Sequence, residues 1–144
     1  MARQAGRTVL VVEDDAALRM LCRVNLELEG YRILEADTPA AARDVLAREQ
    51  PDVILLDIHL GDEDGRDFLV ELRARDPSLP VALFTGTAAI EEALSTDADG
   101  VLRKPFALQE LSATVARLAR GRSHPPSPSS PPGTRDPSAT FERR

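Results

Sequence analysis

Residues 8–15 read Thr-Val-Leu-Val-Val-Glu-Asp-Asp, a short β-branched apolar run followed by three acids. A run of this kind is typical of a strand that is buried on both faces. The acids Glu13, Asp14 and Asp15 come directly after it. The segment therefore predicts a buried strand with carboxylates at its carboxyl end.

Two periodicities alternate from residue 8 to residue 120. Further short apolar runs predict strands at 31–34, 53–56, 81–84 and 101–102. Helical spacing of apolar residues between them predicts helices at about 16–29, 39–49, 66–75, 88–95 and 107–120. The first helix is predicted from an apolar stripe made of Leu18, Leu21, Cys22 and Leu28, and Gly30 closes it. The second begins with Thr38 as its cap and Pro39 as its first residue.

Five strands that alternate with five helices predict an α/β fold, a doubly wound parallel sheet with helices on both faces. In such sheets, ligands bind outside the carboxyl ends of the strands, near the point where the strand order reverses. The residues that follow each strand are therefore the first place to look for a site.

Chain length and composition indicate one domain. The chain has 144 residues, enough for a single core. We expect a flexible start at 1–7, a domain at 8–120, and a disordered tail at 121–144, because this last segment holds six of the eleven prolines and Ser-Pro repeats.

Charge, hydropathy and cysteine content exclude several classes. The net charge is −6, because residues 1–120 carry −8 and residues 121–144 carry +2. The acidic charge of residues 1–120 argues against direct nucleic-acid binding. No apolar run is long enough for a membrane span, and residues 1–7 lack the apolar core of a signal peptide, so we expect a cytoplasmic protein with no membrane partner. Cys22 is the only cysteine, which rules out an intrachain disulfide and a cysteine metal cluster and predicts an ordinary buried thiol.

Polar residues stand at successive strand ends. They are Glu13, Asp14, Asp15, Asp57, Thr85 and Lys104. Each has an ordinary explanation alone: Asp15 can cap the first helix, Thr85 another, and Lys104 can be a surface charge. Their coincidence at one predicted edge of the sheet favours joint action.

The chemistry of this set favours a hard cation and phosphoryl transfer. Crowded carboxylates repel one another unless a cation neutralises them. Oxygen ligands suit Mg²⁺, whereas zinc prefers cysteine and histidine. A carboxylate is also a nucleophile toward phosphoryl groups, and their transfer depends mainly on positioning and charge neutralisation.

Five motifs in order resemble the receiver domains of response regulators in two-component signalling. They are residues 9–15, Leu55-Leu56-Asp57, Asp64-Gly65, Thr85, and Lys104-Pro105-Phe106, so the resemblance covers about residues 8–120. It implies a flavodoxin-like (βα)5 fold with strand order 2-1-3-4-5.

The resemblance also implies a function. Asp57 would accept a phosphoryl group from the phosphohistidine of a sensor kinase or phosphotransfer protein, in a Mg²⁺-dependent reaction. Asp14 and Asp57 would bind Mg²⁺ directly, the backbone carbonyl of His59 would be a third ligand, and Glu13 would act through water. Thr85 and Lys104 would then engage the phosphoryl group. Signalling would pass through protein contacts of the face formed by helix four, strand five and helix five.

This family role implies slow hydrolysis of the protein's own phosphoryl group and not turnover as an enzyme. The kinase, the downstream protein target and a phosphorylation-linked dimer are left open by the sequence.

Four departures from the family pattern stand out. Gly61 replaces the usual proline four residues after Asp57, which predicts a looser loop, and Gly86 replaces the usual alanine. Val101 stands where the family has an aromatic residue, so the usual aromatic switch cannot operate in its usual form. The spacing from Thr85 to Lys104 is about three residues short, which predicts a short or partly ordered fourth helix.

Three other readings stay open. A degenerate receiver would act as a phosphorylation-independent binding module. Residues 57–61 partly match the Asp-x-His-x-x-Gly signature of cobalamin-binding domains, but the glycine comes one residue early. A haloacid-dehalogenase-type phosphatase would need a second aspartate where His59 stands.

Overall fold

The computed structural model of the protein describes residues 6–121. The expectations for residues 1–5 and for the Pro- and Ser-rich segment 122–144 lie outside the described residues.

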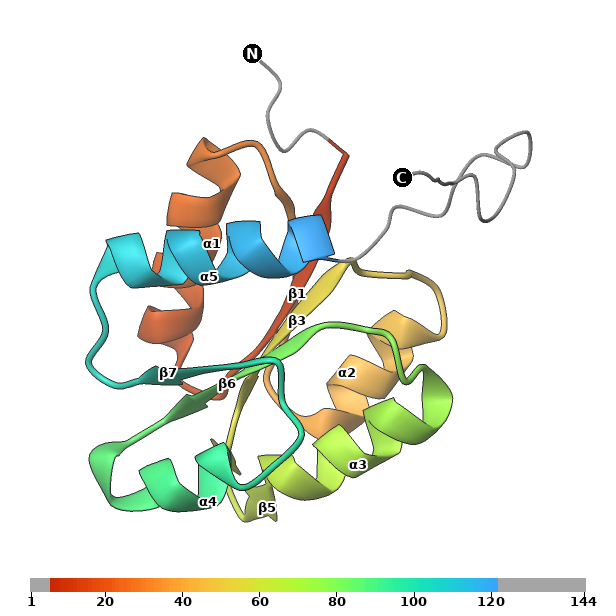
Figure 1. Cartoon of the computed structure of the whole chain (residues 1–144). Coiled ribbons are helices and arrows are strands. Elements are labelled where there is room, and N and C mark those ends of the chain that lie inside the picture. The colour runs from red at the N-terminus through yellow and green to blue at the C-terminus, as the bar shows by residue number, and fades with distance from the viewer. Residues whose placement is uncertain (1–5, 122–144) are drawn as a thin grey trace, which may run out of the picture.

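Five parallel strands form the central sheet (Figure 1). They are β1 (Thr8–Val12), β2 (Arg32–Ala36), β3 (Val53–Asp57), β6 (Val81–Thr85) and β7 (Gly100–Arg103). Their order across the sheet is β2-β1-β3-β6-β7, and because β6 and β7 are the fourth and fifth strands of this sheet along the chain, the predicted order is confirmed. Every residue of β1, β3 and β6 is buried, which explains why these three strands are continuous apolar runs.

Helices cover both faces of the sheet (Figure 1). They are α1 (Ala16–Leu28), α2 (Pro39–Leu46), α3 (Gly65–Arg75), the 3-10 turn η1 (Thr87–Ala89), α4 (Ile90–Leu94) and α5 (Leu108–Gly121). α1 and α5 pack on one face, around Val11, Leu55 and Phe84, and α2, α3 and α4 pack on the other. The predicted caps are confirmed: the Asp15 carboxylate accepts hydrogen bonds from the first turn of α1, and the Thr38 hydroxyl oxygen accepts one from Ala41 N–H.

Two predicted helix details are wrong. The core side of α1 is formed by Cys22 and Leu26, whereas Leu21 and Leu28 are 43% and 77% exposed. The apolar residues of α1 surround more than half of its circumference, so their spacing alone cannot say which of them meet the sheet. α2 ends at Leu46, three residues earlier than expected.

A small antiparallel hairpin follows β3 and has no counterpart among the predicted elements. Its strands are β4 (His59–Leu60) and β5 (Glu63–Asp64), joined by the two-residue turn Gly61-Asp62. Gly61 has a φ of +61°, which a proline cannot adopt. The turn therefore excludes the family's usual proline at this position, and the looser loop stays a prediction.

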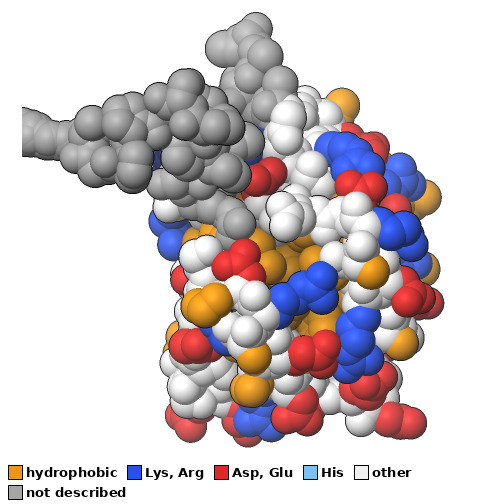
Figure 2. Space-filling model, turned by 90° about the vertical axis from the view of Figure 1, so that its right-hand side faces the viewer, with side chains coloured by type: hydrophobic (Ala, Val, Ile, Leu, Met, Phe, Trp, Pro, Cys, Tyr) orange, Lys and Arg blue, Asp and Glu red, His pale blue; other side chains and the backbone are white. Residues whose placement is uncertain are grey.

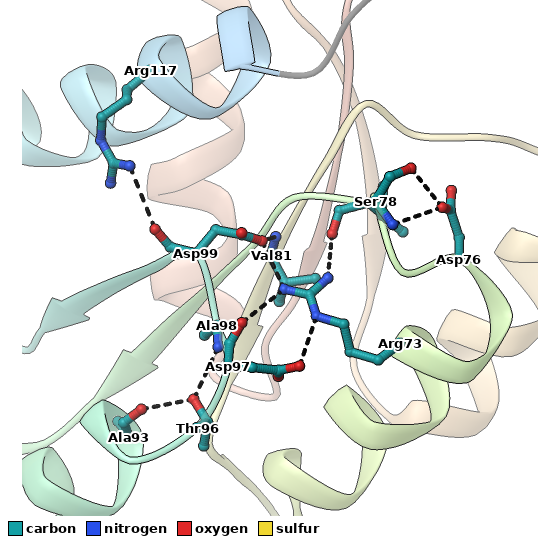
Figure 3. Close-up of polar contacts among 11 residues, drawn as sticks. Arg73, Asp76, Ser78, Val81, Ala93, Thr96, Asp97, Ala98, Asp99 and Arg117 are labelled. Atoms are coloured by element: carbon teal, nitrogen blue, oxygen red, sulfur yellow. Dashed lines mark hydrogen bonds and ion pairs between the residues drawn. The ribbon is translucent and has the colours of Figure 1, made fainter.

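A polar network holds the start of β7, at the sheet edge opposite the acidic one (Figure 3). The Arg73 guanidinium donates hydrogen bonds to the carbonyl oxygens of Leu79 and Asp97 and to Oδ2 of Asp99 (2.5, 3.0 and 2.7 Å). Oδ2 of Asp99 also accepts a hydrogen bond from Val81 N–H (2.9 Å). These bonds join the end of α3 to the loop after α4, so that the shortened α4 segment is anchored although it has few residues.

Surface charge on the face in Figure 2 is mixed. This view looks at the right-hand side of Figure 1, where α2 and α3 lie, and shows acidic and basic side chains interspersed around an apolar hollow. The ion pair between Arg43 of α2 and Glu71 of α3, at 2.7 Å, is one example. None of the helices among residues 6–121 has the length and apolar content that crossing a bilayer requires.

Candidate functional site

Three carboxylates meet where β1 and β3 end. Glu13 and Asp14 follow β1, and Asp57 is the last residue of β3. One carboxylate oxygen from each lies within 4.8 Å of the others. Asp14 is exposed, whereas Glu13 is 0% and Asp57 3% exposed, so two of the three charges are withdrawn from water. The sheet brings together residues that are 44 positions apart, as the strand-end argument predicted.

Lys104 completes this cluster and is the only lysine in the chain. Its Nζ lies 2.8 Å from Oδ2 of Asp57 and 3.1 Å from Oε1 of Glu13. Its backbone N–H donates a hydrogen bond to the carbonyl oxygen of Thr85 (2.7 Å), which fixes the segment after β7 against the end of β6. The side chain is 30% exposed, so the ammonium can be reached from solvent.

Two aromatic rings support the lysine. The rings of Phe84 and Phe106 stack at a centroid distance of 5.3 Å and an interplanar angle of 9°. Lys104 Nζ lies 5.9 Å from the centroid of the Phe84 ring, within the range of a cation–π contact. Phe84 was predicted only as a strand residue; no sequence signal indicated that its ring would contact the lysine.

The electrostatics of the cluster favour the protonated form of Glu13 when no metal ion is bound. Burial, and next the hydrogen bond and charge of Asp57, raise the pKa of Glu13 to about 8, although Lys104 and the Asp15 amide act against this. Burial alone would lower the pKa of Lys104, but the hydrogen bonds and charges of Asp57 and Glu13 outweigh it and raise that pKa above its usual value. The acids thus hold Lys104 in its charged form.

Backbone amides hold the two aspartates. Gly61 N–H donates a hydrogen bond to Oδ2 of Asp14 (2.9 Å), so the hairpin turn contacts the loop after β1. His59 N–H donates to Oδ1 of Asp57 (3.0 Å). Both oxygens of Asp57 therefore have donors, one from His59 and one from Lys104.

Gly65 allows α3 to begin against the end of β3. A Cβ at this position would lie 2.2 Å from the carbonyl oxygen of Asp57 and 2.9 Å from Cα of Ile58. The Gly65 N–H instead donates a hydrogen bond to the Ile58 carbonyl oxygen (2.7 Å). Only a glycine permits this approach, so the residue belongs to the framework of the site.

Thr85 and His59 also lie at this edge of the sheet, where they make different contacts from those of the acids and Lys104. Thr85 is buried at the end of β6, and its hydroxyl donates a hydrogen bond to the Gly86 carbonyl oxygen (3.0 Å). The contact of His59 with Asp57 is made by its amide; the predicted use of its carbonyl as a ligand is not tested by this geometry. The observed proximity of all these residues leaves their chemical roles as predictions.

The donor set fits a magnesium ion. All side-chain donors of the cluster are carboxylate oxygens, which Mg²⁺ prefers. Oε1 of Glu13 is buried beside the two aspartates, and Lys104 Nζ lies 3.1 Å from it. Because Asp14 is exposed, the cluster borders the solvent that supplies the waters Mg²⁺ keeps.

The described part of α4 bears out the expectation of a short helix. α4 has five residues and follows directly on the 3-10 turn. Val101, in the position of the family's aromatic residue, is half-buried and packs against the core on the side of α2, α3 and α4.

A family model for the response regulator receiver domain matches residues 9–116. The chain belongs to this family. The matched range contains the three acids, Thr85 and Lys104. The fold, the strand order and the acidic sheet edge of this chain are therefore those of a receiver domain.

Two curated mycobacterial relatives illustrate the relation. The chain is 36% identical over 125 residues to the probable transcriptional regulatory protein TcrX of Mycobacterium tuberculosis, covering 83% of this chain and 53% of that protein. It is 36% identical over 126 residues to the response regulator MprA of Mycobacterium sp. strain KMS, covering 85% and 55%. The chain thus spans about half the length of the curated relatives it matches.

Solved receiver domains have the same fold. The receiver domain of NtrX from Brucella abortus matches with a TM-score of 0.74 and 29% identity, covering 78% of this chain and 98% of that one. The N-terminal receiver domain of a response regulator from Bacteroides fragilis matches with a TM-score of 0.73 and 28% identity, covering 78% and 95%.

Proposed function

We propose that this receiver domain is a phosphoacceptor and that Asp57 takes the phosphoryl group. The observation that carries the proposal is the contact of Asp57 with the chain's only lysine, beside two further carboxylates. A degenerate receiver has no need for a buried carboxylate that is aligned by both an ammonium and a backbone amide.

Asp57 would act as the nucleophile. One of its oxygens attacks phosphorus, the bond from phosphorus to the donor's histidine nitrogen breaks, and that nitrogen leaves with the electron pair of the broken bond. Lys104 stands where negative charge develops on the phosphoryl oxygens and would stabilise it. The Thr85 hydroxyl, which now donates to the Gly86 carbonyl oxygen, would turn to a phosphoryl oxygen.

Four groups would hold the metal. Asp14 and Asp57 would bind Mg²⁺ directly, together with the carbonyl oxygen of His59, and Glu13 would act through water. Bound Mg²⁺ would neutralise charge between the carboxylates and the incoming phosphoryl oxygens. Because burial keeps a proton on Glu13, its release would accompany metal binding.

The product would be a signal and not a released compound. An aspartyl phosphate carries a charge near −2 in place of the −1 of the carboxylate, and it brings three acceptor oxygens to one edge of the sheet. Lys104 and Thr85, which contact each other through their backbones, would follow the new oxygens and reshape the face of α4, β7 and α5. Val101 has no aromatic ring that could change position on phosphorylation. The aromatic side chain that contacts Lys104 is Phe84, whose ring stacks on that of Phe106. A downstream protein and a phosphorylation-linked dimer are the outputs we propose for this face.

A phosphohistidine-bearing protein would dock on α1. This helix begins directly after Asp15, so its first turn borders the site. Its solvent side carries an apolar stripe made of Met20, Leu21, Val24 and Leu28. A sensor kinase or phosphotransfer protein that covers this stripe would bring its histidine to the acidic edge, and we place the reaction in the cytoplasm.

Intact mass tests the proposal. The protein would be incubated with a small phosphodonor, with and without Mg²⁺, as wild type, as Asp57→Asn and as Asp62→Asn, a control acid in the hairpin turn. We expect one added phosphoryl group that requires Mg²⁺ in wild type and Asp62→Asn and is absent in Asp57→Asn. An unmodified wild type with both small donors and phosphorylated kinases would favour the binding-module alternative.

A further inference from the structure

Arg19 connects α1 to the loop that carries the acids. Its guanidinium donates a hydrogen bond through Nη1 to the carbonyl oxygen of Glu13 (2.7 Å) and another through Nε to Oε1 of Glu35 on β2 (3.1 Å). Helical side chains lean toward the N-terminus of their helix, which brings this guanidinium back over the first turn. The side chain is 20% exposed. One residue thus ties β2 and α1 to the first residue after β1.

The Glu13 carbonyl depends on this donor. The ladder between β1 and β2 ends at the pair Val12 and Ala36, and the Glu13 N–H still donates to the Ala36 carbonyl oxygen (3.0 Å). The carbonyl of Glu13 lies beyond the last strand pair and belongs to a fully buried residue. A buried carbonyl needs a hydrogen-bond donor, and Arg19 supplies it from the side.

Helix stability does not explain an arginine at this position. Arg19 is the fourth residue of α1, at the positive end of the helix dipole, where acids and not bases are favoured. Its value must therefore come from the two contacts that it makes.

We propose that Arg19 is a positioning residue for Asp14 and, through it, for Mg²⁺ binding. The peptide group between Glu13 and Asp14 is planar, so fixing its oxygen also fixes the direction in which the chain leaves toward Asp14. Gly61 N–H holds the other end of Asp14, at Oδ2. Arg19 and Gly61 together preorganise an exposed carboxylate that has no burial to restrain it. The inference rests on the Mg²⁺ site proposed above.

Arg23 offers a matched control on the same helix. Its Nε lies 3.0 Å from the other oxygen of Glu35, but it makes no contact with Glu13 among the described residues. Arg23 also pairs with Glu27 at 3.6 Å. Arg23→Met therefore removes the second ion pair of Glu35 together with the Glu27 pair and leaves the Glu13 carbonyl bonded, whereas Arg19→Met removes a Glu35 ion pair and the hydrogen bond to that carbonyl. Arg19→Lys keeps a donor and serves as the conservative variant.

Calorimetric titration with Mg²⁺ alone tests the inference, on folded proteins whose stability is measured in parallel by urea unfolding. We expect Arg19→Met to weaken Mg²⁺ binding about tenfold, Arg19→Lys to restore part of the loss, and Arg23→Met to stay within about twofold of wild type. In phosphorylation assays, the half-saturating Mg²⁺ concentration of Arg19→Met should rise by the same factor, while the rate at saturating Mg²⁺ is unchanged.

The outcomes separate the two claims. Arg19→Met with the Mg²⁺ affinity of wild type would overturn the positioning role while leaving the metal site intact. An equal loss in Arg19→Met and Arg23→Met would also overturn it, because the Glu35 ion pairs would then suffice. A wild type that binds no Mg²⁺ would overturn the proposed metal site and this inference with it.

Discussion

Nζ of Lys104 lies 2.8 Å from Oδ2 of Asp57, although 47 residues separate them in the chain. The contact exists because β3 and β7 both end at the edge where β1 delivers Glu13, and β6 lies between them. It places one cation and three carboxylates at a single edge. The proposed metal binding and phosphoryl transfer both depend on this arrangement of charges.

Lysine-selective labelling can observe this contact directly. Because Lys104 is the only lysine, reductive ¹³C-methylation will give a single lysine side-chain NMR signal beside that of the α-amino group. We expect the signal to titrate above the usual lysine range, because Asp57 and Glu13 favour the charged form. Asp57→Asn should lower that pKa, and Asp62→Asn should not. An unchanged titration in Asp57→Asn would contradict the pairing.

Stability without metal should fall as pH rises toward 8. The pKa of Glu13 is about 8 in the folded chain against 4.5 for an ordinary glutamate. Between these values the folded state keeps a proton that the unfolded state has released, so the free energy of unfolding decreases with rising pH and levels off above about 8. Urea unfolding in EDTA will measure this. Glu13→Gln cannot titrate, and the same slope in both proteins would refute the assignment.

Gly65→Ala should damage the site through its backbone. The new Cβ would meet the Asp57 carbonyl oxygen at 2.2 Å, which forces α3 or the end of β3 to move. We expect a loss of about 2 kcal/mol or more in unfolding free energy. Gly86→Ala is the matched control, because a Cβ there meets nothing within 4 Å, and it should change stability by less than about 0.5 kcal/mol. Equal effects of the two substitutions would show that the close approach is unimportant.

Substitutions on α1 should separate docking from chemistry. Met20→Asp and Leu28→Asp interrupt the apolar stripe of α1. Val70→Asp is the control, because it places the same charge at an exposed apolar position of α3. With any phosphorylated kinase that acts on the wild type, the α1 variants should react at least about tenfold more slowly, a difference of about 1.4 kcal/mol. All three should react normally with a small phosphodonor. Kinase transfer that is slowed only by Val70→Asp would move the docking surface to α3.

Cys22 should be inert in the folded protein. It is fully buried, and burial, followed by the charge of Glu13, raises the pKa of its thiol to about 12. The reactive thiolate is therefore scarce at neutral pH. Alkylation followed by mass spectrometry should detect no adduct in native buffer and a single adduct in urea. Rapid alkylation of the native chain would show that α1 opens locally.

Several features were predictable from local sequence because local interactions decide them. The buried strands are apolar runs, Asp15 and Thr38 cap helices within their own turns, and parallel strands must end at a common edge. That rule was enough to predict that Asp57 and Lys104 would lie together with the acids of residues 13–15.

Other features were decided by the tertiary structure, because they depend on partners far away in the chain. The side of α1 that is buried depends on how the helix settles on the sheet, so Leu26 replaced Leu21 and Leu28 in the core. The need for glycine at position 65 comes from the backbone of Asp57, eight residues earlier, and is invisible to any helical or strand periodicity.

The charge state of the site is likewise a tertiary property. The sequence alone determined that this chain has an acidic strand edge and one lysine to meet it. Only the packed sheet decided that Glu13 is withdrawn from water and Asp14 left in it, and that Arg19 holds the peptide between them. Burial and hydrogen-bond geometry set how each carboxylate behaves, and neither exists until the strands are side by side.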